Sequence, residues 1–412
     1  MRIAIIGAGI SGLLSLKYAK ESGHECHVFE QTGELGGTWV YTEKYGTDEN
    51  GMPITQRMYK DLVTNTPKEI MILPDYQYPS HIENSYITQP EVLEYIRGFA
   101  NKFDLERHIH YYAYVTKVEP SGEQWIVTVM DVKAKEELPA CYDAVFVCNG
   151  AYLHPRMPEI EGQDLFKGLQ ISSRDYRNPD LYKSKRVLIV GGSFSAVDIA
   201  NQITAVAEKV YISHWGSLLQ KVTNVTLKPG VSQLYNDGAV FVDGSKEDFD
   251  IILYCTGYER VFPFLTKECG ITVEDNWVQY LYKHTISIEK PTLYFIGVPH
   301  YIGAFINSNL QARFSVAALD GKFSLPSKEE MRKEIDDNVN ELRNRNVPQR
   351  HFHNIGLGLR EYMADLCRTA GIRPFPEVIT RLHDHLIHTV STMQKNAKYV
   401  IVDDEQFLKL NN

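Results

Sequence analysis

The sequence predicts an α/β protein built from two Rossmann-like domains, the second inserted into the first, with a helical C-terminal tail. A buried strand, a glycine-rich turn and a helix follow one another twice, at residues 3–19 and 187–200. A further apolar strand completes each unit, at 142–150 and 249–258, and the apolar run 291–297 indicates a return to the first domain. We expect the first domain to comprise residues 1–165 and 285–412, including the tail, and the second domain residues 166–284.

The first unit has the spacing of a dinucleotide-binding turn. Ile3 to Ile6 form an apolar run typical of a strand buried on both faces, and Gly7, Gly9 and Gly12 follow it. These glycines permit a tight turn, a close approach of the backbone to a pyrophosphate, and close packing of helix on sheet. The next strand ends at a carboxylate placed to accept hydrogen bonds from a ribose. The predicted contacts in this unit are Gly7, Gly9, Ser11, Gly12, Glu30 and Gln31.

The second unit departs from this spacing at the middle glycine. Gly191 follows the buried strand 187–190, but Ser193 stands at the second position, and Ser195 lies in the following turn. The strand 209–213 ends without an acidic residue, and a carboxylate there would repel a 2′-phosphate. Ser213 and His214 therefore favour NADPH over NADH, and the next cation along the chain is Lys221.

The elements between and after the two units are simpler. We expect a helix near 89–103, strands around 111–118 and 125–132, and charged helices from residue 327 onward, as in 328–345. Two dinucleotide units in one chain indicate a flavin held against a nicotinamide, so that hydride passes between them.

Composition narrows the class of protein further. The 412 residues carry a net charge of −9, which argues against a nucleic-acid partner. No apolar run approaches the roughly 18 residues of a membrane span, and Met1 leads directly into a strand. The six cysteines include no C-x-x-C pair. We expect a cytoplasmic protein, or a secreted one if a signal peptide was removed before this chain.

Five segments together resemble the flavin-containing monooxygenase family over roughly the first 320 residues. They are 34–39, similar to the G-G-x-W segment beside the flavin; 62–69, similar to the segment whose asparagine faces the flavin; 166–177, similar to the family fingerprint; 254–258, similar to the A-T-G-Y strand end; and 311–314, similar to the closing Q-A-R-W. Within the family the chain most resembles soluble insect enzymes, including the pyrrolizidine-alkaloid N-oxygenases.

The resemblance implies FAD and NADPH as cofactors and adds residues to the site. Asn65 is the implied catalytic residue, because its amide can donate to the reacting side of the flavin without supplying an acidic proton. The further implied cofactor contacts are Gly37, Thr38, Trp39, Asn65 itself, Thr66, Val115, Thr256, Gly257 and Gln311.

The fingerprint segment departs from the family at one position. Ser172 stands where histidine is expected, which bears on cofactor turnover and NADP⁺ retention. Tyr176 and Arg177, in place of Trp-Pro, point away from the related Baeyer–Villiger branch.

The implied activity is oxygenation of a soft nucleophile. NADPH reduces FAD, O₂ gives a C4a-hydroperoxyflavin, and a tertiary amine or sulfide takes the distal oxygen; a tertiary-amine alkaloid is the expected substrate. The partners are therefore a small molecule and O₂, with a homo-oligomer left open. The alternatives are a Baeyer–Villiger oxygenase and a flavin-binding protein that has lost turnover. A disulfide reductase needs a redox cysteine pair, and the nearest pair, Cys141 and Cys148, has six residues between its members.

Histidines near the C-terminus invite comparison with a metal site. His383, His385 and His388 lie close together with Asp384 in the sequence. We interpret them as residues of a solvated helix and predict no metal site.

Overall fold

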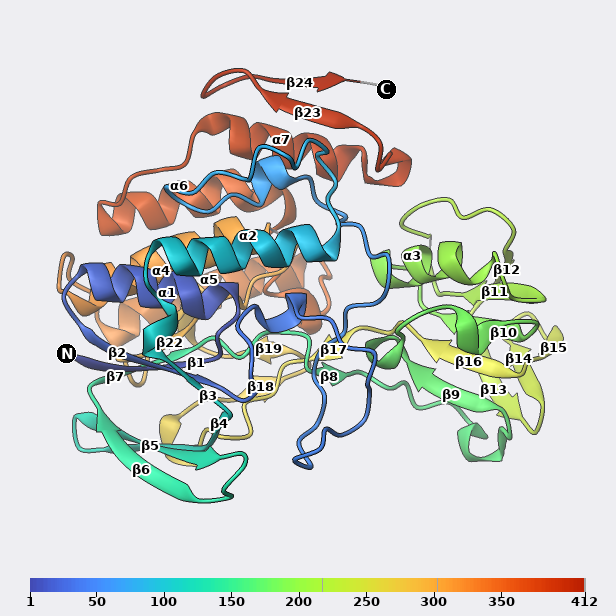
Figure 1. Cartoon of the computed structure of the whole chain (residues 1–412), viewed down its shortest axis with the longest axis horizontal. Coiled ribbons are helices and arrows are strands. Elements are labelled where there is room, and N and C mark those ends of the chain that lie inside the picture. Colours follow the sequence, from blue (N-terminus) through green and yellow to red (C-terminus); the bar gives the residue numbers. More distant parts are fainter. Residues whose placement is uncertain (217, 302, 411–412) are drawn as a thin grey trace.

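The computed structural model describes residues 1–216, 218–301 and 303–410, and it contains two mainly parallel sheets at opposite ends of the long axis (Figure 1). The first sheet has seven strands in the order β20-β21-β22-β7-β1-β2-β3. Its strands are β1 (Arg2–Ile6), β2 (Glu25–Glu30), β3 (Ile109–Tyr111), β7 (Ala144–Val147), β20 (Leu281–Tyr282), β21 (Ile286–Ser287) and β22 (Leu293–Phe295). The antiparallel strands β20 and β21 form one edge, and the other five strands run parallel.

The second sheet has five parallel strands in the order β12-β11-β10-β16-β9. They are β9 (Leu169–Ser172), β10 (Arg186–Val190), β11 (Lys209–Ser213), β12 (Thr226–Lys228) and β16 (Ile251–Tyr254). All five lie between β7 and β20 in the chain, so the second sheet is inserted within the first.

The two units repeat the same local construction. In each unit the strand before the glycine turn lies between the next strand and a third one, in the orders β7-β1-β2 and β16-β10-β11. Each of these first strands begins at an arginine whose backbone N–H donates to an aspartate just before the third strand: Arg2 to Asp143 and Arg186 to Asp250, both at 2.7 Å. The duplication predicted from the sequence is therefore present in the structure.

The seven described helices, coloured from blue to red along the chain, lie mostly over the first sheet (Figure 1). They are α1 (Ile10–Glu21), α2 (Gln89–Lys102), α3 (Phe194–Ile203), α4 (Ala304–Leu319), α5 (Lys328–Asn344), α6 (Leu359–Ala370) and α7 (Glu377–His388). Side chains alternate along β1, so Ile3 and Ile5 pack with the helices while Ala4 and Ile6 pack with the opposite layer. That layer is an antiparallel sheet of β4 (Ala113–Ser121), β5 (Gln124–Asp131) and β6 (Glu137–Tyr142).

Smaller elements complete the fold. A three-stranded sheet of the second unit and three strand pairs are formed by β13 (Val231–Tyr235), β14 (Gly238–Phe241) and β15 (Lys246–Asp248); β8 (His154–Pro155) with β17 (Tyr258–Glu259); β18 (Val273–Glu274) with β19 (Trp277–Val278); and β23 (Lys398–Ile401) with β24 (Phe407–Leu410).

The α/β class is confirmed, and so is the mainly helical tail. The tail packs onto the core of the first domain, because Leu359, Leu366 and Leu382 belong to the same buried cluster as α1, α2 and α4. It ends in the β23–β24 hairpin, which the helical prediction did not include. The domain limits at 165/166 and 284/285 stay predictions. β20 precedes the second of these limits, although it is paired into the first sheet.

Candidate active site

Two positions of the first glycine turn must be glycine because of the close packing around them. Gly7 has φ +104°, and a Cβ there would lie 2.7 Å from the carbonyl oxygen of Cys148, at the end of β7. A Cβ on Gly12 would lie 1.9 Å from the carbonyl oxygen of Gly7. Both glycines are needed to bring α1 onto the sheet, whatever ligand is bound.

Gly9 differs from these two glycines. Its φ of −75° suits any residue, and among the described residues the atom nearest to a Cβ there would be the Gly37 Cα at 3.5 Å. The fold alone therefore leaves room for a side chain at this position. In the described chain, Gly9 is the N-cap of α1, and this helix has no side-chain cap and no acidic residue in its first turn. Free helix amides beside an open cradle suit a pyrophosphate, so this turn fits FAD.

The loop 33–39 is held against this turn. The Gly36 N–H donates to the Ala8 carbonyl oxygen at 3.0 Å, and the Gln89 side chain on α2 donates to the carbonyl oxygen of Trp39. Gly37 has φ +56°, and a Cβ on it would lie 2.8 Å from the Gly9 Cα. Gly37, Thr38 and Trp39 thus lie on a segment that is fixed beside the cradle.

Glu30 supports the turn from within. Its Oε2 accepts a hydrogen bond from the Ala8 N–H at 2.9 Å, and its Oε1 accepts from the Thr32 N–H and hydroxyl. Burial raises the pKa of this carboxyl, while these bonds act in the opposite direction. A contact between Glu30 and a ribose stays a prediction.

Ser11 and Gln311 connect the turn to α4. The hydroxyls of Ser11 and Ser308 are 2.8 Å apart, and the Gly297 N–H donates to Gln311 Oε1 at 2.8 Å. The amide nitrogen of Gln311 donates to the hydroxyl of Tyr362. Because the Gln311 side chain is fully buried and these contacts engage both its oxygen and its nitrogen, it holds the turn after β22 in place. Its direct contact with a cofactor stays a prediction.

The second glycine turn repeats the first in one respect. Gly191 has φ +127°, and a Cβ there would lie 2.3 Å from the carbonyl oxygen of Cys255, at the end of β16. Ser193 is exposed at the start of α3, and its side chain does not cap the helix in the described residues. Ser195 is partly buried in the first turn. The free amides of α3 therefore suit the phosphates of a second dinucleotide.

The residues expected to select NADPH differ in whether their side chains are available to a ligand. Ser213 is 1% exposed, and its hydroxyl donates to the Pro229 carbonyl oxygen at 2.6 Å, so its donor is used within the protein. His214 is partly exposed, and its Nδ1 is buried without a partner in the described chain. Lys228, which the sequence analysis missed, pairs in register with Ser213, but its ammonium contacts Glu247 at 2.8 Å.

Thr256 and Gly257 form the turn after β16. The Thr256 hydroxyl donates to the carbonyl oxygen of Arg156 at 2.5 Å, and the Arg156 N–H donates to the Gly257 carbonyl oxygen at 2.9 Å. Gly257 has φ +90°, and a Cβ there would meet no atom of the described residues within 4 Å. This turn is fixed in place and has open space in front of it.

Asn65 follows a segment of the first unit that is embedded in the second. Tyr59 is buried in the core cluster around α3, and Leu62 packs against the same cluster. The chain then returns to the first unit, where the Thr64 N–H donates to the Ile87 carbonyl oxygen at 2.8 Å. The exposed Asn65 side chain accepts a hydrogen bond from the Thr66 hydroxyl at 3.3 Å.

A cluster around Arg57 was missed by the sequence analysis. The Arg57 Nε donates to the Thr38 hydroxyl at 3.0 Å, and its guanidinium lies 4.0 Å from the ring centre of Tyr152 and 5.7 Å from that of Tyr258. His300 contacts Tyr152 from the turn after β22, and burial lowers the pKa of His300 to about 3. These side chains come from both units. No periodic pattern in the sequence connects them.

Three other positions singled out from the sequence make contacts within the protein, and the cofactor contacts of Val115 and Gln31 stay predictions. The Val115 side chain is buried in the core under the first sheet, and the Gln31 amide donates to the Thr55 hydroxyl at 3.0 Å. Ser172 ends β9, and its hydroxyl accepts from the Arg174 N–H at 3.2 Å, which caps the next turn. A histidine would replace this small hydroxyl with a larger ring at a buried position.

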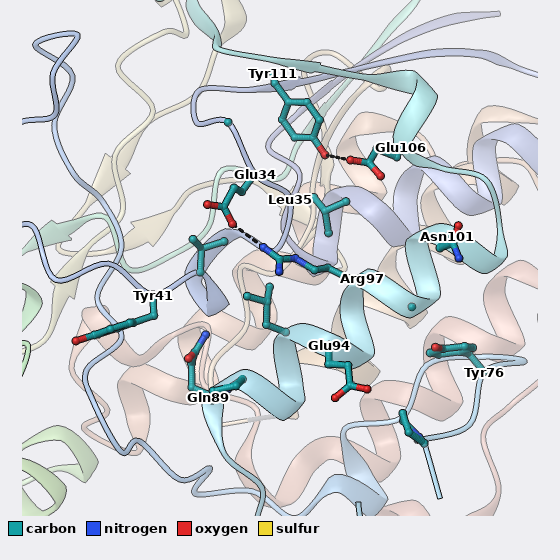
Figure 2. A pocket seen from close by; sticks show the side chains of 16 residues that line it. Glu34, Leu35, Tyr41, Tyr76, Gln89, Glu94, Arg97, Asn101, Glu106 and Tyr111 are labelled. Atoms are coloured by element: carbon teal, nitrogen blue, oxygen red, sulfur yellow. Dashed lines mark hydrogen bonds and ion pairs between the residues drawn. The ribbon is translucent and has the colours of Figure 1, made fainter. Parts of the chain in front are cut away.

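A cavity of about 820 Å³ borders the loop 33–41 (Figure 2). Two of its carboxylates are engaged by neighbouring side chains: Glu34 with Arg97 at 2.6 Å, and Glu106 with the Tyr111 hydroxyl at 3.0 Å. Its described lining includes none of the motif glycines, so it is a neighbour of the glycine turn and not the cradle itself.

The expectation of a solvated histidine helix is wrong for His383. This residue is 4% exposed, because α7 buries the face that also carries Val378, Ile379 and Leu382. Within residues 1–216, 218–301 and 303–410, no group of three or more histidine, cysteine or acidic side chains has the arrangement of a metal site. In the same ranges, no helix has the length and apolar character needed to cross a membrane.

Comparison with known proteins identifies the family. Residues 1–224 and 218–390 match the family described as Flavin-binding monooxygenase-like. Senecionine N-oxygenase of Tyria jacobaeae is 32% identical over 422 residues, which cover 100% of this chain and 92% of that protein. Flavin-containing monooxygenase FMO GS-OX5 of Arabidopsis thaliana is 34% identical over 396 residues, covering 91% and 86%.

A solved structure supports the same conclusion. S-allyl-L-cysteine S-oxygenase from Allium sativum superimposes with a TM-score of 0.87 at 32% identity, covering 94% of this chain and 92% of that one. The family resemblance inferred from sequence motifs is thereby confirmed over nearly the whole length. Because relatives match from end to end and both glycine turns fit a dinucleotide, the chain belongs to the flavin-containing monooxygenases, enzymes that use FAD and NADPH.

Proposed function

We propose that this enzyme transfers one atom of O₂ to the nitrogen of a tertiary-amine alkaloid, and that sulfides are its second substrate class. The observation that carries the proposal is the full-length similarity to a senecionine N-oxygenase. The similarity to an S-oxygenase, also at 32% identity, supports sulfides as a second class of substrate. The balanced reaction converts amine, O₂, NADPH and one proton into N-oxide, NADP⁺ and water.

Groups at the two glycine turns bind the two cofactors. FAD, once reduced by NADPH, supplies the activation of O₂. The amides at the start of α1, with Gly9 left open, hold the FAD pyrophosphate, and those of α3 around Ser193 and Ser195 hold NADPH. His214 is the candidate for the 2′-phosphate side, since the Ser213 hydroxyl is engaged elsewhere.

Asn65 is the proposed catalytic residue. Its amide donates a hydrogen bond at the reacting face while releasing no proton of its own, so it stabilises bound oxygen without promoting loss of hydrogen peroxide. Around it, Thr66, Trp39 and Thr38 complete the flavin side of the site. No general base is required, because an unprotonated amine already presents its lone pair.

A substrate panel tests the function. The FAD-loaded enzyme is given NADPH and air with senecionine, with an alkyl sulfide, or with cyclohexanone, and NADPH loss, peroxide and products are measured together. N-oxide formation that matches NADPH loss supports the proposal, and sulfoxide formation alone selects the second substrate class. An ester from the ketone would establish Baeyer–Villiger chemistry, and peroxide without any oxygenated product would indicate a flavoprotein that has lost oxygenation.

We also propose a reducing compartment such as the cytoplasm. All six cysteines are free in the structure, and five of them are buried. Thiol titration of protein from its native source tests this, because disulfide-bonded chains would contradict it.

A further inference from the structure

The C-terminal tail makes a three-way contact with both units through one lysine. Lys395 lies between α7 and β23, and its ammonium is 2.6 Å from Asp198 Oδ1 and donates to the Val63 carbonyl oxygen at 3.0 Å. The pair is partly shielded from solvent, with 33% of the Lys395 side chain and 24% of the Asp198 side chain exposed. In Figure 1 this stretch leads from the end of α7, on the side of α3, into β23.

The Asp198 side of this contact belongs to the second unit. Asp198 lies on α3, one turn after Ser195, on the helix whose first amides are proposed to hold NADPH. Its other oxygen accepts a hydrogen bond from the Tyr59 hydroxyl at 2.5 Å. A second tail contact supports the first, because the Gln220 amide donates to the Val390 carbonyl oxygen at 2.9 Å. The tail is therefore attached to the second unit at two points.

The Val63 side of the contact belongs to the segment that carries Asn65. Val63 lies two residues before Asn65, and it forms an isolated bridge with Thr88 at the start of α2. Lys395 of the tail thus holds the carbonyl oxygen of Val63, while backbone contacts with the first unit hold the residues around it. One ammonium spans the point where the chain leaves the second unit and returns to the first.

We propose that Lys395 is a positioning residue of the oxygenation reaction. It holds the Asn65 segment against α3, so that the C-terminal tail sets how fully NADPH oxidation is coupled to oxygen transfer. This inference rests on the role of Asn65 in the proposed function. It assigns a task to a tail whose sequence carries no catalytic motif.

The test compares matched substitutions in the full-length, FAD-loaded enzyme. Lys395→Met removes both contacts, Lys395→Arg keeps a cation with several donors, and Lys409→Met makes the same change at an exposed lysine of β24. We expect the ratio of oxygenated product to hydrogen peroxide to fall about tenfold in Lys395→Met, as about 1.4 kcal/mol of lost positioning would produce. We expect partial recovery in Lys395→Arg and no change in Lys409→Met. Unchanged coupling in Lys395→Met with FAD still bound would overturn the proposal.

Two further measurements separate this proposal from its foundation. Hydrogen exchange of the amides of residues 62–66 should accelerate in Lys395→Met and not in Lys409→Met, a result that does not depend on turnover. Equal exchange in both variants refutes the positioning role even if the enzyme oxygenates amines. If Lys395→Met fails to fold, Lys395→Gln replaces it, and unchanged coupling and exchange in that variant refute the proposal. Failure of the wild type to oxygenate any substrate refutes the proposed function, while faster exchange would still support the contact.

Discussion

Gly9→Ala tests whether the open space at residue 9 is needed for FAD binding and not for folding. The added methyl would lie 3.5 Å from the Gly37 Cα, an ordinary contact, and φ at Gly9 is already suitable for alanine. We therefore expect the stability of the apoprotein to change by less than about 1 kcal/mol. Gly12→Ala is the matched control, because its methyl would lie 1.9 Å from the Gly7 carbonyl oxygen, and such overpacking costs about 1–3 kcal/mol or more.

The cost of Gly9→Ala should appear when FAD binds. A phosphate oxygen bonds to a backbone amide at about 2.9 Å, and the methyl occupies part of the space that this approach requires. Loss of one charge-assisted hydrogen bond costs about 1.5–3 kcal/mol, which is about a 10- to 140-fold loss of affinity. Titration of apoprotein with FAD, followed by flavin fluorescence, gives the affinity, and urea unfolding of the apoprotein gives the stability. FAD affinity equal to the wild type, or apoprotein destabilisation equal to that of Gly12→Ala, would refute this reasoning.

Four other predictions concern the rest of the site. Asn65→Ala should retain FAD but divert most NADPH oxidation to hydrogen peroxide, and a peroxide assay showing intact coupling would exclude its proposed role. Arg57→Leu should lower the free energy of unfolding by about 0.5–2 kcal/mol, since the hydrogen bond to Thr38 and the cation–π contact with Tyr152 are lost; urea unfolding equal to that of the wild type would contradict this. Ser172→His should lower the free energy of unfolding by about 0.5–2 kcal/mol through loss of its cap, and a variant as stable as the wild type in urea would contradict this. Burial holds the pKa of His353 well below 6.5, so as the pH falls below 6.5 the unfolded chain binds a proton that the folded chain does not. The free energy of unfolding should therefore decrease by up to about 1.4 kcal/mol for each unit by which the pH falls. In His353→Gln, urea unfolding should show a shallower dependence on acid pH.

Local patterns predicted the parts of the site that lie on regular elements. Each glycine turn follows a continuous apolar strand and begins a helix, so the positions of Gly7 and Gly191 could be inferred from neighbouring residues alone. The same patterns could not show that the fold requires glycine at Gly7 but would accept a larger residue at Gly9. That difference depends on how closely Cys148 and Gly37, which are distant in the sequence, approach the two positions.

Contacts between distant segments could not be predicted. Arg57 lies in a stretch without periodicity, and only the folded chain brings it to Tyr152 and Thr38. The inward orientation of the Ser213 hydroxyl depends on Pro229, in a strand connection sixteen residues later. The burial of His383 depends on the way α7 packs, because Val378, Ile379 and Leu382 on the same helix join the core cluster of the first domain.

The embedding of Tyr59 among the residues around α3 has a consequence for building chimeras. A second unit excised at the strand boundaries would lack this aromatic ring and would expose the cluster that the ring covers. Exchange of nicotinamide specificity between relatives by grafting that unit alone should therefore yield insoluble protein, unless the donor's counterpart of residues 56–62 is transferred with it. The inserted domain is thus not a self-sufficient folding unit, because part of its core comes from a short stretch of chain more than 100 residues upstream.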